Sequence, residues 1–176
     1  MTIDRTRTLR GALAGAVAAG VWALQMPLDK RVFEYPFDDI ELLGKAVHRG
    51  RGWRALGVAI HLQNGAVFGA LYANAAPAVP LPSWSRGPLA GTLENFATWP
   101  LTLLSDRLHP ARRELPVLST SPRALAQSTW RHLVFGVVLG ELERRLNAAP
   151  DEEPRPWAGA ISTNGHGNIE HAAALR

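Results

Sequence analysis

Nearly all the formal charge of this chain lies outside four long apolar windows. The windows are residues 11–28, 55–76, 87–105 and 124–140. The chain has 19 basic and 15 acidic residues, yet the windows contain only two charged side chains, Glu94 and Arg131. A soluble amphipathic helix needs a charged stripe on its wet face, and these windows have none. Each is close to the length that crosses about 30 Å of hydrocarbon at about 1.5 Å per residue.

The pattern predicts an all-α integral membrane bundle of four transmembrane helices with short loops. The predicted spans are residues 10–28, 54–76, 87–106 and 123–143 of a single domain, 1–147. Pro100 predicts a kink in the third span. Residues 148–176 are rich in Pro, Asp, Glu, Asn and Gly, which is typical of a flexible polar tail.

Other readings of the same windows are a soluble four-helix bundle, or two or three spans with one interfacial segment. The basic leader, residues 1–10, followed by an apolar run also describes a secretory signal. The small-residue cleavage pattern Ala16-Val17-Ala18 lies in the middle of the apolar run rather than at its end. This position favours an uncleaved first span.

Composition excludes several kinds of site and partner. The chain has no cysteine, so it has no disulfide, thiolate nucleophile or cysteine metal site. Its net charge of +4 comes from basic residues beside apolar segments, which favours anionic lipid headgroups over nucleic acid. Self-association is left open. Hydrolase, phosphate-loop, zinc-protease and dinucleotide motifs are absent from the sequence, so no catalytic residue and no metal ligand is assigned.

Each predicted span contains a Gly-x-x-x-Gly pair. The pairs are Gly11 with Gly15, Gly65 with Gly69, Gly87 with Gly91, and Gly136 with Gly140. Small residues four apart let two helices approach closely, and such packing replaces the hydrophobic drive that lipid does not supply. The pairs therefore predict helix packing rather than chemistry.

A set of polar residues falls near the middle of the predicted spans. Its members are His61, Asn64, Glu94, Asn95, Arg131 and His132. If the spans alternate in direction, Glu94 and Arg131 lie at similar depth on neighbouring helices. An ion pair between them would offset an insertion cost of roughly 2.5–3.5 kcal/mol for a central arginine. His61 and Asn64 are three residues apart and share a helix face.

Three interpretations of this network remain open. In the first, Glu94 and Arg131 only fix the register of two helices. In the second, carboxylate and imidazole groups form a proton or solute conduit. In the third, His61 and His132 are the two axial ligands of a haem.

The spans also carry motifs that resemble the YagU-like family of small bacterial inner-membrane proteins. The motifs are GALAGAVAAGVWALQMPL ending near Pro27, His61 followed by VFGALY, GPLAG followed by WPL, and HLVFGVVLGELERRL from His132. The resemblance implies four helices, a bacterial plasma-membrane location and an association with survival in acid. His61 and His132 match positions of the family pattern, whereas Glu94, Asn95 and Arg131 do not.

The sequence thus predicts a multi-pass plasma-membrane protein with a structural or acid-tolerance role and no assigned enzymatic activity. Basic residues flank the spans on both sides, so their count does not settle the orientation. The basic leader favours cytoplasmic termini.

Overall fold

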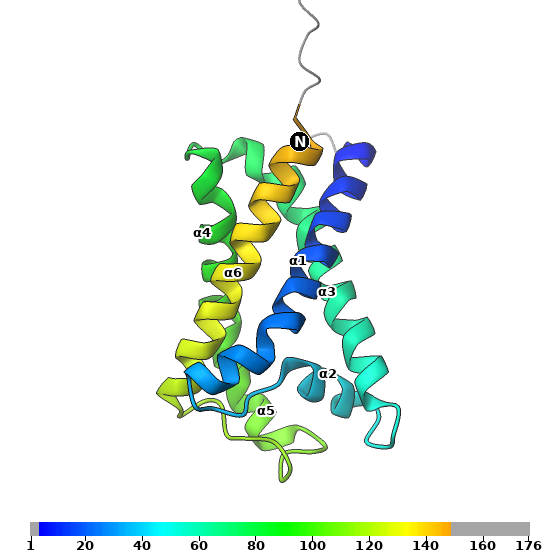
Figure 1. Cartoon of the computed structure of the whole chain (residues 1–176), viewed down its shortest axis with the longest axis vertical. Helices are drawn as coiled ribbons and strands as arrows, with labels where there is room; N and C mark the ends of the chain where they lie inside the picture. Colours follow the sequence, from blue (N-terminus) through cyan, green and yellow to red (C-terminus); the bar gives the residue numbers. More distant parts are fainter. Residues whose placement is uncertain (1–3, 149–176) are drawn as a thin grey trace, which may run out of the picture.

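The computed structural model describes residues 4–148, which form helices and turns without a strand. Its long helices are α1 (Arg5–Val32), α3 (Trp53–Ala75), α4 (Ser83–Thr98) and α6 (Pro122–Leu146), which run along the long axis (Figure 1). Two shorter helices are α2 (Asp39–Val47) and α5 (Thr102–Leu108), and two 3-10 turns are η1 (Ala76–Ala78) and η2 (Trp99–Leu101). The all-α prediction is confirmed for these residues. The predicted tail, 148–176, lies outside them except for its first residue.

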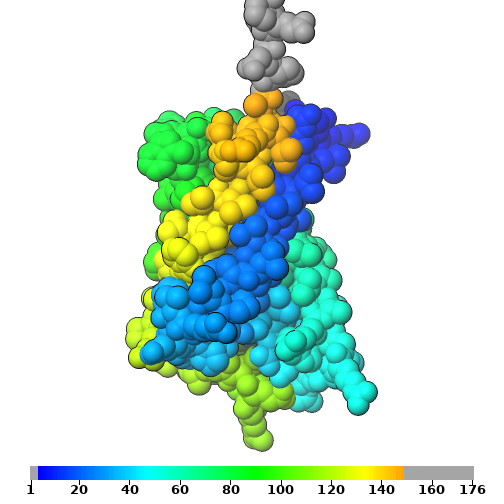
Figure 2. Space-filling view, viewed as in Figure 1, coloured from blue at the N-terminus to red at the C-terminus, as the bar shows by residue number. Residues whose placement is uncertain are grey.

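The two ends of the bundle differ. Helices α2 and α5 lie at the end that we call the loop end, and α1 begins and α6 ends at the opposite, terminal end (Figure 1). At the terminal end Arg7 on α1 donates to the Ala73 carbonyl on α3 at 2.6 Å and pairs with Glu143 on α6. Helix α1 also lies along α6, as the space-filling view shows (Figure 2).

The glycines of the Gly-x-x-x-Gly pairs lie at two helix contacts, of which the first joins α1 to α3. Gly11 and Gly15 on α1 face Gly65 and Gly69 on α3. A Cβ added at Gly15 would lie 2.0 Å from the Gly65 carbonyl oxygen, and one added at Gly69 would lie 2.2 Å from the Gly11 carbonyl oxygen. The two helix backbones therefore touch directly along this contact.

The second contact joins α4 to α6. Gly87 and Gly91 on α4 face the α6 backbone around Gly136 and Gly140. A Cβ added at Gly91 would lie 2.3 Å from the His132 carbonyl oxygen, one turn before Gly136. A Cβ added at Gly140 would lie 3.0 Å from the Gly87 Cα, so Gly140 has somewhat more space than the other three. This contact also brings backbone against backbone, and it fixes α4 beside the residues of α6 that precede Gly136.

A third close contact joins α2 to α3, and it was not predicted. A Cβ at Gly44 would lie 2.1 Å from the Trp53 carbonyl oxygen, and one at Gly57 would lie 2.1 Å from the Ile40 carbonyl oxygen. These two glycines are not four positions apart, so they form no Gly-x-x-x-Gly pair. The spacing of glycines alone therefore does not predict this contact. Their contact fixes α2 across the loop end.

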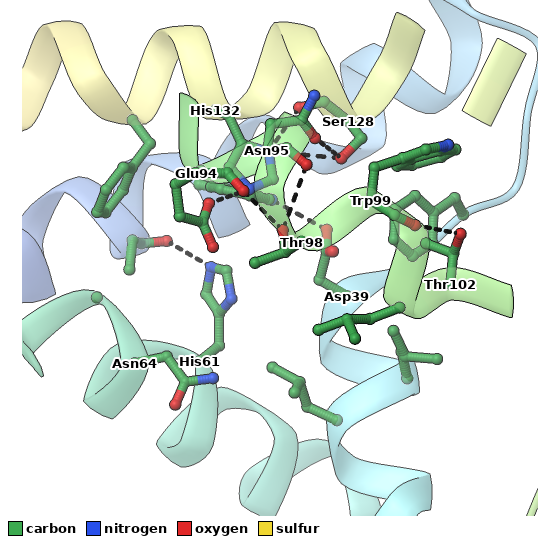
Figure 3. Close-up of a pocket in the computed structure, with 18 of the residues that line it drawn as sticks. Asp39, His61, Asn64, Glu94, Asn95, Thr98, Trp99, Thr102, Ser128 and His132 are labelled. Carbon is green, nitrogen blue, oxygen red and sulfur yellow. Dashed lines mark hydrogen bonds and ion pairs between the residues drawn. The ribbon is translucent and has the colours of Figure 1, made fainter. Parts of the chain in front are cut away.

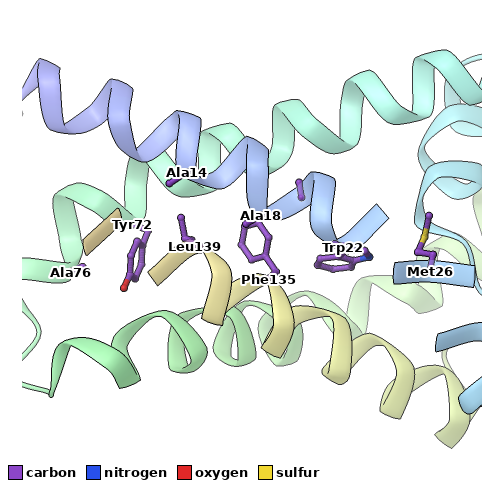
Figure 4. Close-up of a cluster of buried hydrophobic side chains, with 9 residues drawn as sticks. Ala14, Ala18, Trp22, Met26, Tyr72, Ala76, Phe135 and Leu139 are labelled. Carbon is purple, nitrogen blue, oxygen red and sulfur yellow. The ribbon is translucent and has the colours of Figure 1, made fainter. Parts of the chain in front are cut away.

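Small residues are inside the bundle and many large apolar residues are outside. The core cluster contains Ala14, Ala18 and Ala19 of α1 with Phe135 and Leu139 of α6 (Figure 4). The exposed apolar side chains include Leu9, Leu13, Leu24, Val67, Leu71, Leu89, Leu93, Phe96, Leu133 and Val137, with Leu24 83% exposed. All four long helices contribute to this apolar outer surface.

Two helical segments, Arg5–Val32 and Trp53–Ala78, are long and apolar enough to cross a membrane. The other two predicted spans, 87–106 and 123–143, are not among the helices that meet these criteria. Helix α4 starts at Ser83, earlier than predicted, and ends at Thr98, where η2 with Pro100 interrupts the predicted span. Helix α6 is long enough but carries Arg131 and a charged final turn with Arg144 and Arg145.

Candidate functional site

A buried ion network joins the first and last long helices near the loop end. Arg131 on α6 is fully buried, and its Nε and Nη2 donate to the two carboxylate oxygens of Asp29 on α1 at 2.7 and 2.6 Å. Its Nη1 donates to Asp39 on α2 at 2.6 Å, and its Nη2 also donates to the Phe37 carbonyl at 2.9 Å. One guanidinium thus binds two carboxylates and one carbonyl in a fixed fork geometry.

Neutral side chains complete the carboxylate coordination. Gln127 and Gln25 each donate an amide hydrogen to Asp29, at 2.7 and 2.9 Å. The Trp22 indole N–H donates to Asp39 at 3.0 Å. Each carboxylate therefore accepts hydrogen bonds besides those from the arginine, as burial of a charged group requires.

The predicted Glu94–Arg131 ion pair is wrong in this structure. Helices α4 and α6 do pack together, but successive residues of a helix point about 100° apart. Arg131 is directed toward α1 and α2, and the next residue, His132, meets Glu94 instead. Asp29 was missed because the predicted first span ends at residue 28, whereas α1 continues to Val32.

Glu94 and His132 form a second close pair. The Nε2 of His132 lies 2.6 Å from Glu94 Oε2, and its Nδ1 lies 2.8 Å from the Ser128 carbonyl oxygen. A carbonyl only accepts, so Nδ1 carries a hydrogen. A hydrogen bond between Nε2 and Glu94 then requires one more proton, held either by the imidazole or by the carboxyl group.

The remaining predicted residues surround this pair. Asn95 on α4 is buried, accepts from the Ser128 hydroxyl at 2.7 Å and donates to Thr129 at 3.0 Å. His61 on α3 contacts the Ala19 carbonyl through Nε2 at 3.2 Å. Asn64, one turn further along α3, lines the same cavity.

The cavity lies between α3 and α4, where these helices diverge, and has a volume of about 490 Å³. Figure 3 shows His61 and Asn64 on one side and Asn95 and Ser128 on the other. Helix α2 and the η2–α5 segment close it toward the loop end, with Asp39, Leu42, Trp99 and Thr102 among the lining residues. The structure thus brings five of the six predicted polar residues to this cavity, and directs Arg131 away from it.

The two histidines do not fit the haem interpretation. The Trp22 ring lies edge-on against both imidazoles, with centroid distances of 5.2 Å to His61 and 4.5 Å to His132. Trp22 therefore occupies the space beside both rings, and both nitrogens of His132 already face oxygen atoms. Within residues 4–148 no group of three or more His, Asp or Glu side chains is arranged to hold a metal ion.

The loop end carries an acid-sensitive cap. Asp38 caps α2 by accepting from the Glu41 backbone N–H at 2.9 Å and pairs with Lys30 at 2.5 Å. Burial alone would raise the pKa of Asp38, but the hydrogen bonds from Lys30 and Glu41 and the charge of Lys30 outweigh burial and hold the pKa below its ordinary value of 3.8.

We expect the α2 segment to lose stability in acid as a consequence. A carboxyl group whose pKa is lowered on folding stabilises the fold above its unfolded pKa, and this contribution is lost as the pH falls through the folded pKa. The protection factors of residues 39–47, that is, exchange rates corrected for the intrinsic rate at each pH, should therefore fall at a pH below about 3.8. Asp38→Asn should remove this pH dependence while keeping the cap. An equal acid response in wild type and variant would contradict the prediction.

No protein family, curated protein or solved structure matches this chain.

Proposed function

We propose that this chain is a four-span protein of a bacterial plasma membrane that handles protons in a ligand-binding cavity within the bilayer. The apolar outer surface on α1, α3, α4 and α6 supports the four spans. The glycine contacts support the same proposal, because they pack helices without large buried side chains. In this proposal α4 alone is too short for the third span, because its 16 residues extend only about 24 Å. The 3-10 turn η2 and the start of α5 therefore complete that span.

The Glu94–His132 pair carries the proton-handling part of the proposal. The two groups lie on the wall of a cavity with His132 Nε2 2.6 Å from Glu94 Oε2, and the Glu94 side chain is 35% exposed. A carboxylate and an imidazole are the usual groups of membrane proton relays. Arg131 and Asp29, by contrast, are buried and pair with each other, which supports a structural role for that part of the bundle.

The resemblance to the YagU-like family belongs to the same proposal. An association with survival in acid is compatible with a membrane pair that exchanges protons with its cavity. The competing proposal is that both polar groups only stabilise the bundle, and it predicts no proton movement.

A combined spectroscopic and flux experiment tests the proposed function. In lipid nanodiscs, ¹⁵N spectra of labelled histidine should show His132 Nε2 hydrogen-bonded to a shared proton in the wild type. In Glu94→Gln the side-chain amide should donate to Nε2, so this nitrogen should become a plain acceptor. The rate of proton flux in liposomes should also differ between Glu94→Gln and the wild type.

Glu34→Gln is the matched control, because Glu34 is an exposed carboxylate outside the cavity whose side chain is 74% accessible. It should leave the histidine spectrum and the flux unchanged. If Glu94→Gln lowers thermal stability but the wild type shows no proton movement, the pair is structural and the proposed function fails.

A further inference from the structure

A second cavity continues the gap between α3 and α4 toward the terminal end. It has a volume of about 340 Å³ and shares Phe68 with the first cavity. Leu71, Tyr72, Leu89 and Leu93 are among its lining residues, with Arg86 as the charged one, and the wall is otherwise almost entirely apolar. Leu71 and Leu93 are also exposed on the outer surface, so this groove opens sideways, toward the lipid of the proposed membrane.

The first cavity differs from this groove in its chemistry. Its lining residues in the described part of the chain include the carboxylates of Asp39 and Glu94 but no lysine or arginine. Arg131 does not line this cavity. It pairs with Asp39, which does, and also with Asp29. The polar cavity therefore has an excess of negative charge, which favours a cation.

Aromatic rings stand beside these carboxylates. The polar cavity is lined by Trp22, Phe37, Phe68, Trp99 and Phe135. Aromatic faces attract organic cations through the ring quadrupole, by about 0.5–2 kcal/mol per contact. Carboxylates combined with aromatic rings are therefore suited to an ammonium or phosphonium centre, and an apolar groove beside them is suited to its hydrocarbon substituents.

We propose, on the basis of the proposed function, that the ligand of this cavity is a lipophilic organic cation that enters from the bilayer between α3 and α4. The cation lies among Glu94, Asp39 and the aromatic rings, and its apolar part lies along Leu71 and Leu93. A phospholipid headgroup fits less well, because its phosphate would face the same carboxylates.

Two probes of the same size and opposite charge test this inference. Tetraphenylphosphonium should bind saturably to the full chain in nanodiscs of zwitterionic choline lipid, after subtraction of empty nanodiscs, and tetraphenylborate should not. Glu94→Gln should weaken tetraphenylphosphonium binding by about tenfold or more, because it removes a carboxylate next to the cation. Glu34→Gln should bind like the wild type.

A cavity-filling variant keeps the test valid if Glu94→Gln does not fold. Asn64 lines the cavity and is exposed, so Asn64→Trp fills space without disturbing a packed core. It should abolish binding of tetraphenylphosphonium. Equal binding of the two probes, or unchanged binding in both variants, would overturn the inference.

Two further outcomes separate this inference from the proposed function. A histidine spectrum that depends on Glu94 together with no tetraphenylphosphonium binding would refute the cation site and leave proton handling standing. Loss of tetraphenylphosphonium binding in ethanolamine lipid but not in choline lipid would identify a headgroup amine as the occupant, and would overturn the assignment to a free cation.

Discussion

Replacing Arg131 by methionine should strongly destabilise the folded bundle. The change keeps much of the side-chain volume but leaves the carboxylates of Asp29 and Asp39 buried without a cation. Removing one partner of a buried ion pair costs about 3–5 kcal/mol, which is a large fraction of the about 5–15 kcal/mol that stabilises a typical domain. Thermal unfolding in detergent, followed by circular dichroism, would measure the loss.

The loss should be reversed by removing the stranded charges. Adding Asp29→Asn and Asp39→Asn to Arg131→Met should restore much of the thermal stability, since neutral amides are far less costly to bury. Arg144→Met is the matched control, because Arg144 is half exposed and pairs with Glu141 on the surface of α6, and it should leave the unfolding temperature nearly unchanged. An Arg131→Met variant as stable as the wild type would show that the network contributes nothing.

A single added methyl group at Gly15 should separate α1 from α3. The new Cβ would lie 2.0 Å from the Gly65 carbonyl oxygen, and backbone cannot yield as a flexible side chain does. Overpacking of this kind costs about 1–3 kcal/mol. This cost outweighs the gain of about 1 kcal/mol that alanine brings over glycine inside a helix. We expect Gly15→Ala to lower the unfolding temperature.

Gly20 on the same helix supplies the control. A Cβ there would meet only Leu62 Cδ2 at 3.9 Å, an ordinary van der Waals contact. Gly20→Ala should therefore be neutral or stabilising, through helix propensity alone. If both alanine variants shift the unfolding temperature in the same direction, close backbone contact is not what holds α1 to α3.

The sequence predicted helix type and approximate position well, because those depend on local composition. The apolar windows are local signals, and each of the four overlaps a long helix of the structure. The depth estimate also brought Glu94 close to the right neighbour on α6. It could not choose between Arg131 and His132, because the choice depends on the rotation of α6 about its own axis.

The acidic partners of Arg131 were harder to predict for a different reason. Asp29 begins the polar, charged stretch that follows the first apolar window, so the predicted span ends one residue before it. Asp39 reaches the arginine only because the chain reverses after α1 and α2 then packs on α3 through Gly44 and Gly57. Such non-local contacts leave no periodic trace in the sequence.

The pairing of Asp29 with Arg131 also has a consequence for the timing of synthesis. The two residues are 102 positions apart. At about 5–20 residues per second, the ribosome adds the arginine roughly 5–20 s after the aspartate. Throughout that interval the nascent first helix carries its carboxylate without the cation that later neutralises it. Completion of the loop end must therefore wait for the last helix, and a chain released before α6 is translated would retain an acidic group that a degradation system could recognise as unassembled.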